Sequence, residues 1–117
     1  MIIDKPWGRV TSYSLNQPAS VRLISIEPGA ETSEHYHQLR EEMWVVLDEG
    51  MVLQIGNRRV EAVRGQEFMV SAEEPHRISN TGTVPGRVLE IAYGYTTEED
   101  TFRLSDEYGR ELEDHEW

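Results

Sequence analysis

The sequence predicts an all-β domain, a sandwich or barrel of short strands, followed by a short helical C-terminal tail. Nearly every segment up to residue 95 is rich in β-branched and aromatic residues and ends at a turn signal. Only Thr97-Glu98-Glu99-Asp100 has the N-cap residue and the acidic first turn that favour a helix. No repeat, linker or low-complexity segment interrupts the chain, so residues 1–117 are expected to form one domain.

The expected strands follow from the turn signals that separate them. Pro28-Gly29 stops a segment rich in valine and isoleucine, and Gly56-Asn57 favours a tight hairpin because both residues tolerate positive φ. The strands are expected at residues 8–15, 19–27, 31–38, 42–47, 51–55, 58–63, 67–70, 76–79 and 87–93. The helix is expected to last one or two turns, and Tyr108-Gly109 is expected to break it.

The composition excludes several classes of protein. A net charge of −11 argues against a nucleic-acid partner, since binding to a phosphate backbone needs clustered lysine and arginine. The last 20 residues hold nine acidic residues and two arginines and are expected to be a solvated surface. No apolar run approaches the ~18–20 residues of a membrane-spanning helix, and no signal peptide is visible. The chain has no cysteine, which excludes disulfides and thiolate ligands and fits a cytoplasmic location.

Three histidines and one carboxylate form the strongest candidate site. His35 and His37 are two residues apart in an expected strand, so their side chains point to the same face. Glu42 begins the next expected strand, and His76 begins a distant one. Burying these groups without a cation would leave polar atoms unsatisfied. The pattern therefore predicts one divalent metal ion held by imidazole nitrogen and carboxylate oxygen.

The spacing of these residues resembles the two motifs of the cupin superfamily. In the first motif, five residues separate Gly29 from His35, one separates His35 from His37, and four separate His37 from Glu42. In the second motif, ten residues separate Gly65 from His76, and three separate His76 from Asn80. The second motif departs from the superfamily at Ser71 and Glu73, in the loop before the ligand. The resemblance implies a double-stranded β-helix, the cupin jelly-roll barrel. It also implies that the metal ligands are His35, His37, Glu42 and His76.

The first motif leaves two candidates for its carboxylate. Glu41 satisfies the shorter form of the spacing and Glu42 the longer form. Glu42 shares its strand face with Trp44 and Val46, an apolar set that suits a barrel interior. Glu42 is therefore the preferred ligand, and Glu41 is expected to point outward.

Most of the chain also resembles the cupin domain of type II mannose-6-phosphate isomerases. The matching residues are Lys5-Pro6-Trp7-Gly8, Pro28-Gly29-Ala30, Tyr36-His37, Arg40, Glu42 and Trp44-Val45-Val46, then Glu90, Gly94-Tyr95, Glu99-Asp100, Arg103, Asp106 and Tyr108-Gly109-Arg110. Those isomerases usually have glutamine at the position of His35 and histidines at the positions of Gln38-Leu39 and Met43. The ligand set thus resembles the general cupin pattern more closely than the isomerase pattern.

The resemblance implies an aldose–ketose isomerisation of a sugar phosphate in carbohydrate metabolism. A metal would polarise the sugar oxygens while a protein base moves a proton, and the candidate bases are His76 and Glu41. Two alternatives stay open: a non-catalytic cupin that binds a sugar or a metal, and another metal-dependent cupin enzyme such as an oxygenase. The metal is Zn, Mn, Fe, Ni or Co.

The remaining candidate residues would bind a small-molecule substrate. Arg40, Arg103 and Arg110 are candidates for the phosphate, because a guanidinium can bind phosphate with two hydrogen bonds. Trp44 and Tyr93 are candidates for the wall of an apolar cavity. Structural salt bridges for the arginines and plain core packing for the aromatic residues stay open as alternatives. A homodimer is expected by analogy with other small cupins.

Overall fold

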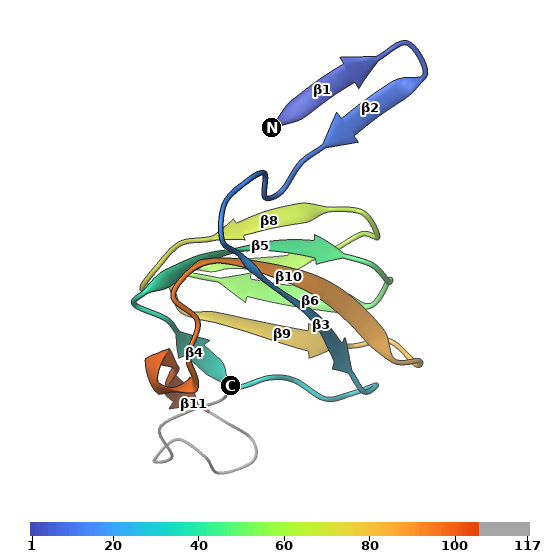
Figure 1. The fold of residues 1–117 in the computed structure, drawn as a ribbon. Helices are drawn as coiled ribbons and strands as arrows, with labels where there is room; N and C mark the ends of the chain where they lie inside the picture. The colour runs from blue at the N-terminus through green and yellow to red at the C-terminus, as the bar shows by residue number, and fades with distance from the viewer. Residues whose placement is uncertain (106–117) are drawn as a thin grey trace.

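Two antiparallel sheets are stacked around the hydrophobic core in a computed structural model that describes residues 1–105 (Figure 1). One sheet has the strand order β3-β10-β5-β8, the other has β11-β4-β9-β6-β7, and β1 and β2 form a separate hairpin. The elements are β1 (Ile2–Lys5), β2 (Gly8–Thr11), β3 (Ser20–Ile26), β4 (Glu34–Tyr36), β5 (Arg40–Val46), β6 (Met51–Ile55), β7 (Arg58–Glu61), β8 (Glu67–Val70), β9 (His76–Asn80), β10 (Gly86–Gly94), the 3₁₀ helix η1 (Glu98–Asp100) and β11 (Phe102–Ser105). The predicted all-β class is confirmed.

The core lies between the two sheets because their strands alternate apolar and exposed positions. Trp44 and Val46 of β5 point inward, and Leu53 and Ile78 of the opposite sheet pack in the same cluster. Each of these side chains is at most 2% exposed, and burying one contributes roughly 1.5–3 kcal/mol. Glu42 is buried on the same face as Trp44, as the strand pattern predicts.

The turn at the end of β10 needs a glycine. Gly94 has φ +111°, and a Cβ atom there would lie 2.5 Å from the backbone oxygen of Leu39. A side chain would therefore force the chain away from the segment that leads into β5. Gly56 in the β6–β7 hairpin also has positive φ, as the turn signal predicts.

The predicted helical tail is wrong. Residues 98–100 form only a single 3₁₀ turn, and the chain continues as strand β11, which pairs with β4. The carboxylate of Asp100 accepts hydrogen bonds from the backbone N–H groups of Gln38 and Leu39, both at 2.9 Å. Phe102 stacks on Tyr36 with ring centroids 5.2 Å apart. These long-range contacts outweigh the local helix signal. Separately, no helix within residues 1–105 is long and apolar enough to cross a membrane.

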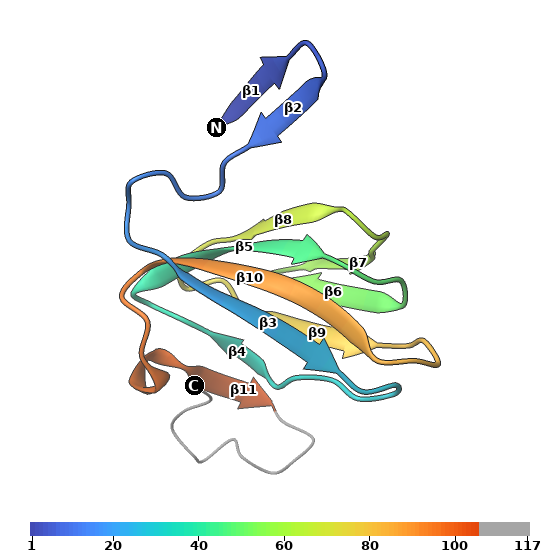
Figure 2. The same cartoon turned by 45° about the vertical axis from the view of Figure 1, so that its right-hand side comes forward.

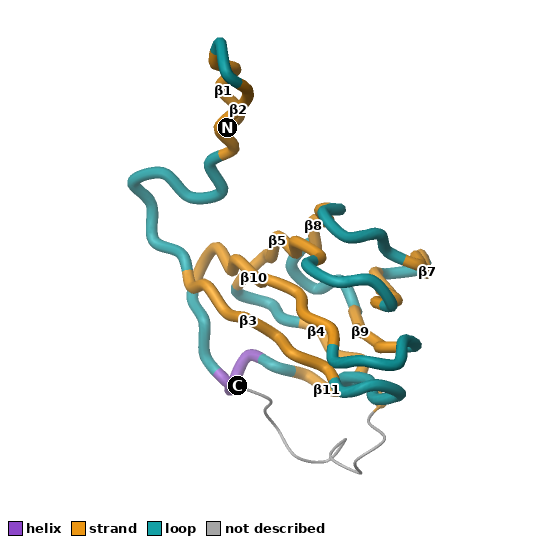
Figure 3. Tube along the Cα trace, turned by 90° about the vertical axis from the view of Figure 1, so that its right-hand side faces the viewer, coloured by secondary structure: helices purple, strands orange, loops and turns teal. Residues whose placement is uncertain are grey.

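The N-terminal hairpin stands away from the sandwich, and we call residues 1–11 the arm (Figures 1, 2 and 3). The expected strand over residues 8–15 is shorter, and it pairs with β1, which the turn signals do not predict. Every residue of β1 and β2 is exposed. Residues 12–19 connect the arm to β3.

Candidate metal centre

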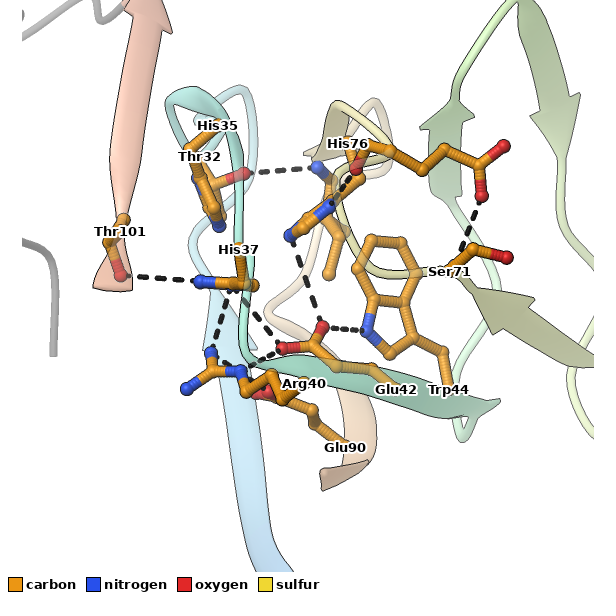
Figure 4. Close-up of polar contacts among 12 residues, drawn as sticks. Thr32, His35, His37, Arg40, Glu42, Trp44, Ser71, His76, Glu90 and Thr101 are labelled. Carbon is orange, nitrogen blue, oxygen red and sulfur yellow. Dashed lines mark hydrogen bonds and ion pairs between the residues drawn. The ribbon is translucent and has the colours of Figure 1, made fainter. Parts of the chain in front are cut away.

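The three predicted histidines meet at one point inside the sandwich (Figure 4). His35 lies in β4, His37 directly follows that strand, and His76 begins β9 as the register partner of His35. One ring nitrogen from each histidine lies within 4.8 Å of the others, and all three side chains are buried. The β4–β9 pairing therefore brings together residues that are some 40 positions apart in the chain.

The Nδ1 atom of each histidine ring forms a hydrogen bond with a backbone carbonyl oxygen, on the side of the ring away from the other histidines. The Nδ1 atoms of His35, His37 and His76 lie 3.1, 3.0 and 2.9 Å from the carbonyl oxygens of Ser33, Asp100 and Glu74, respectively. A carbonyl oxygen only accepts, so each Nδ1 carries the hydrogen and each Nε2 keeps its lone pair. This arrangement is typical of histidines that bind a metal, because the outer partner fixes the tautomer and the ring orientation.

The three imidazoles are neutral at physiological pH. Burial lowers the pKa of His35 to about 2, helped by His76 and His37 nearby. Burial also lowers the pKa of His37 to about 4, against the attraction of Glu42, and it lowers the pKa of His76. Neutral imidazole is the form that binds metal ions, so the protonation state suits a metal centre.

His76 supplies the observation that tests the fit of a metal. Its Nε2 atom is buried without a hydrogen-bond partner in the described chain, and the nearest carboxylate oxygen, Oε1 of Glu42, is 3.9 Å away. A buried polar atom left without a partner costs about 1–3 kcal/mol, which coordination of a cation would remove. Three imidazole nitrogens with one carboxylate suit Zn, Mn, Fe, Ni or Co. The three histidines therefore fit the predicted metal, which at His37 would replace the hydrogen bond that Nε2 accepts from Arg40.

Arg40 and two glutamates form a buried charged cluster beside the histidines (Figure 4). Arg40 donates to Glu42 Oε2 at 2.8 Å and to His37 Nε2 at 2.9 Å, and its Nη2 atom lies 3.5 Å from Glu90 Oε1. Trp44 Nε1 donates to Glu42 Oε1 at 2.9 Å. The predicted phosphate ligand Arg40 is thus a partner of the predicted metal ligands.

The two glutamates of the cluster differ in protonation. Burial opposes ionisation of Glu42, but a hydrogen bond with Glu90 and the adjacent His76 outweigh it and lower the pKa of Glu42. Burial and the same hydrogen bond raise the pKa of Glu90. One carboxyl of the pair is therefore ionised at neutral pH while the other keeps a proton, a division that is common among groups that transfer protons.

A cavity of about 250 Å³ lies next to this centre. Its polar wall includes His35, His76, Glu42 and Glu90, and its apolar wall includes Trp44. The volume is just under the roughly 300 Å³ at which small-molecule pockets begin. The cavity is therefore suited to a small ligand.

A family model described as "Mannose-6-phosphate isomerase C-terminal" matches residues 2–106. The chain belongs to this family. The chain is 33% identical over 117 residues to "Mannose-1-phosphate guanylyltransferase" from Escherichia coli, with 92% of the chain and 23% of that protein covered. It is 31% identical over 109 residues to "Xanthan biosynthesis protein XanB" from Xanthomonas campestris pv. campestris (strain B100), with the same coverage. The chain thus spans about a quarter of the length of these relatives.

The solved structures confirm the predicted fold of this mannose-6-phosphate isomerase C-terminal domain. A protein from Klebsiella pneumoniae subsp. pneumoniae MGH 78578, described as having a double-stranded β-helix domain, aligns with a TM-score of 0.61. The alignment covers 70% of this chain and 72% of that chain at 18% identity. At this identity the likeness shows the fold alone, which is the double-stranded β-helix of cupins.

Within this domain, the structure gathers some of the other predicted residues and separates the rest. Trp44 lines the cavity. Glu41 is exposed on the opposite face of β5, and Tyr93 lies on the outer face of β10, where its hydroxyl donates to the carbonyl of Tyr13. Arg103 is buried on β11 as the register partner of His35, and Arg110 lies outside the described residues.

Two cavity residues of the domain were missed by the sequence reasoning. Glu90 lies between Val88 and Ala92 on the inward face of β10, and Arg22 lies two positions before Ile24 on the inward face of β3. The alternation of side chains along a strand indicates both residues, because each is a charged residue at an inward-facing position whose neighbours on that face are apolar. The sequence instead predicts Arg40, Arg103 and Arg110 as phosphate ligands, because a guanidinium can bind phosphate with two hydrogen bonds.

Proposed function

We propose that this domain binds one divalent metal ion and isomerises a sugar phosphate, interconverting mannose 6-phosphate and fructose 6-phosphate. The convergence of three neutral imidazoles, two of which (His35 and His76) line a sugar-sized cavity, carries the proposal. The names of the family and of the E. coli relative support mannose phosphates as the substrate class. The name of XanB supports a place in polysaccharide synthesis.

The metal ligands of the proposal are His35, His37, His76 and Glu42. The bound ion would act as a Lewis acid toward the substrate oxygens and stabilise negative charge on them. Arg40 and Trp44 position Glu42 by donating to its two oxygens from opposite sides. The proposed ligand carboxylate therefore has a fixed orientation before any ligand arrives.

Proton transfer is assigned to Glu90 in place of the predicted base Glu41. Glu41 lies on the outer face of β5, whereas Glu90 lines the cavity. Oε2 of Glu90 is buried and has no hydrogen-bond partner within residues 1–105, so it is available to a ligand. His76, the other predicted base, is assigned to the metal, which leaves Glu90 as the acidic group able to exchange a proton with the sugar.

Phosphate binding is assigned to Arg22 in place of Arg40. Arg40 is fully buried among Glu42, Glu90 and His37, so its charge is balanced inside the protein. Arg22 lines the cavity from β3, on the strand face that also carries Ile24. A guanidinium at this place offers a planar pair of donors to a phosphate.

The proposal is tested by metal analysis together with a turnover assay. Purified protein is expected to hold one divalent ion per chain and to convert mannose 6-phosphate to fructose 6-phosphate. Chelation abolishes turnover, and addition of the metal restores it. His76→Ala is expected to lose the ion, whereas Glu41→Gln, a matched acidic control next to Glu42 on the outer face, keeps both ion and activity.

Each alternative function predicts a different result in the same assay. Tightly held iron with oxygen uptake and without isomerisation would favour an oxygenase. Stoichiometric metal with sugar binding but no turnover would favour a non-catalytic domain. Isomerisation that survives His76→Ala would overturn the metal-dependent proposal.

The single domain over residues 1–117 and the cytoplasmic location stay predictions.

A further inference from the structure

Arg40 is a cation that the fold itself places in the candidate metal centre (Figure 4). It begins β5 two residues before Glu42, so strand alternation puts both side chains on the inner face. Its register partner on β10 is Gly94, which has no side chain to occupy the interior opposite Arg40. The Arg40 side chain is fully buried, so water does not compete for its hydrogen bonds. The contacts inside the protein therefore decide where its charge lies.

The guanidinium of Arg40 binds two of the atoms that the proposed function assigns to the metal. Its Nε atom donates to Glu42 Oε2 at 2.8 Å, and its Nη2 atom donates to His37 Nε2 at 2.9 Å. These two acceptor atoms lie 3.3 Å from each other, and the neutral imidazole carries its hydrogen on Nδ1, which donates to the carbonyl of Asp100. Two acceptors at this distance repel each other unless one donor group binds both. In this structure that donor is Arg40.

His37 cannot bind Arg40 and a metal ion at the same time. A neutral imidazole has a single acceptor nitrogen with one lone pair, and at Nε2 the hydrogen from Arg40 occupies it. Glu42 differs from His37, because a carboxylate has about four acceptor positions and can keep a hydrogen bond while it also binds a metal. Coordination by His37 therefore breaks the hydrogen bond from Nη2 of Arg40 and leaves the one from Nε in place.

Glu90 provides a second acceptor for the Nη2 atom that leaves His37. Oε1 of Glu90 lies 3.5 Å from Nη2 of Arg40, at the limit of hydrogen-bond distance, and both residues are buried. A buried charge that loses its partner is costly. A turn of the guanidinium from His37 toward Glu90 keeps the charge of Arg40 paired, so the interior can accommodate either arrangement.

We propose that Arg40 competes with the metal ion for the lone pair of His37 and thereby sets the metal affinity of the centre. The inference rests on the metal ligands of the proposed function and does not depend on the isomerisation. His76 contrasts with His37, because its Nε2 atom has no hydrogen-bond partner in the described chain and can bind a metal without displacing one. His76 is therefore expected to bind first, and His37 only after it exchanges Arg40.

A purely supporting role for Arg40 predicts a change of affinity in the opposite direction. Loss of an outer partner that only orients a metal ligand typically weakens metal binding about 10–100-fold. Loss of a competitor tightens metal binding instead. A hydrogen bond from a charged donor corresponds to a change of about ten- to a hundredfold in a dissociation constant. The sign of the change therefore separates competition at His37 from support of Glu42.

Arg40→Lys tests the competition, because lysine keeps a cation and a donor nitrogen for Glu42 but loses the second arm of the planar guanidinium. Co²⁺ is the probe, and its dissociation constant is measured by calorimetric titration of the full chain after chelation and dialysis. Arg40→Lys is expected to bind Co²⁺ about tenfold or more tightly than the wild type. The matched control is Arg77→Lys, because Arg77 follows His76 but pairs with Glu31 at 3.7 Å and donates to no ligand nitrogen in the described chain. Its dissociation constant is expected to stay within about twofold of the wild-type value.

The rate of Co²⁺ binding, followed by stopped-flow absorption, is a second readout that the wild type alone provides. Because His37 first has to exchange Arg40, the observed rate for the wild type is expected to level off as the Co²⁺ concentration rises. Arg40→Lys is expected to reach a higher limiting rate. These readouts measure binding and not turnover.

An unchanged or weaker affinity in Arg40→Lys would overturn the competition and leave the metal site in place. A wild-type rate that rises in proportion to Co²⁺ throughout would do the same. Absence of Co²⁺ binding in both proteins would overturn the competition together with the metal site. Tighter binding in Arg40→Lys without turnover of mannose 6-phosphate by the wild type would support the competition and contradict only the isomerisation.

Discussion

The two faces of the sheet β3-β10-β5-β8 differ from those of an ordinary sandwich, in which the inner face is apolar and the outer face is polar. The inner face carries Arg22, Arg40, Glu42 and Glu90 among its apolar residues, and the last three are almost fully buried. The outer face carries two apolar rows across its strands, in which Val21, Leu23 and Met69 are exposed and Ile91 is buried. Charge inside a core reduces stability unless something binds it. The comparison therefore indicates that the inner face is the one at which a ligand would bind.

The two faces also differ in how their residues are held. Each buried charge has specific partners at short distances, such as Arg40 with Glu42 at 2.8 Å. The outer rows make ordinary apolar contacts with their neighbours in register. A substitution inside is therefore expected to change stability strongly, and a substitution outside is expected to change it little.

The largest expected effect comes from breaking the inner charge cluster with Arg40→Met. The change leaves Glu42 buried without its cation, and such a loss typically costs about 3–5 kcal/mol of unfolding free energy. Urea denaturation measures it. The control is Arg87→Met, which removes an exposed ion pair with Asp48 and is expected to leave the urea midpoint unchanged. An Arg40→Met midpoint equal to that of the wild type would show that the cluster does not stabilise the fold.

A smaller effect is expected from pH, acting on the inner face of the metal-free protein. The pKa of His37 falls from its ordinary 6.5 to about 4 on folding, so below pH 6.5 the unfolded chain takes up a proton that the folded chain does not. The contribution of His37 is therefore expected to be constant above pH 6.5 and to fall as the pH drops toward 4. Glu90 acts in the opposite direction, because its raised pKa lets the folded chain keep a proton that the unfolded chain loses, so its contribution falls as the pH rises. The loss from His37 alone is on the order of 3 kcal/mol. His35, whose pKa is lowered further, adds to the same trend.

The measurement is urea denaturation in chelator at several pH values between 4 and 7.5. His37→Gln is expected to reduce the slope below pH 6.5, because glutamine does not titrate in this range. Equal slopes for the wild type and His37→Gln below pH 6.5 would contradict a neutral, buried His37. Excess metal is expected to raise stability at pH 7.5 and to lose this effect at low pH, because protonation competes with coordination.

The sequence was sufficient for the parts of this protein that depend on local pattern. The spacing in the sequence predicted His35, His37 and His76, which the structure brings together. Strand alternation correctly predicted that Glu42 shares a face with Trp44. Alternation along a strand fixes which side chains share a face, and turn residues fix where strands end. Both signals act over a few residues and can be read without knowing the fold.

The parts that the sequence did not predict depend on contacts between distant segments. Residues 97–100 have a local helix signal, but Asp100 accepts from the backbone of residues 38 and 39, and residues 102–105 continue as a strand beside β4. Arg22 and Glu90 become cavity residues only because β3 and β10 pair in register, with Arg22 opposite Glu90. Arg40 was assigned to a ligand because nothing local shows that Glu42 and Glu90 surround it.

The smallest expected change in monomer stability, and the sharpest contrast between the two faces, comes from one isosteric change at two adjacent residues. Val45 and Val46 are consecutive on β5 and point to the outer and inner faces, respectively. Val46→Thr places a hydroxyl in the fully buried core and is expected to cost about 1–3 kcal/mol. Val45→Thr is expected to change the unfolding free energy by less than about 0.5 kcal/mol, because Val45 is only partly buried.

Urea denaturation at one low protein concentration measures the free energy of unfolding of the wild type and of both variants. Val46→Thr is expected to lower the urea midpoint, and Val45→Thr is expected to leave it close to that of the wild type. Equal losses of stability for both variants would show that the outer row is buried as deeply as the core. The two faces would then no longer differ in kind, and the β5 strand would be an ordinary core strand with polar neighbours.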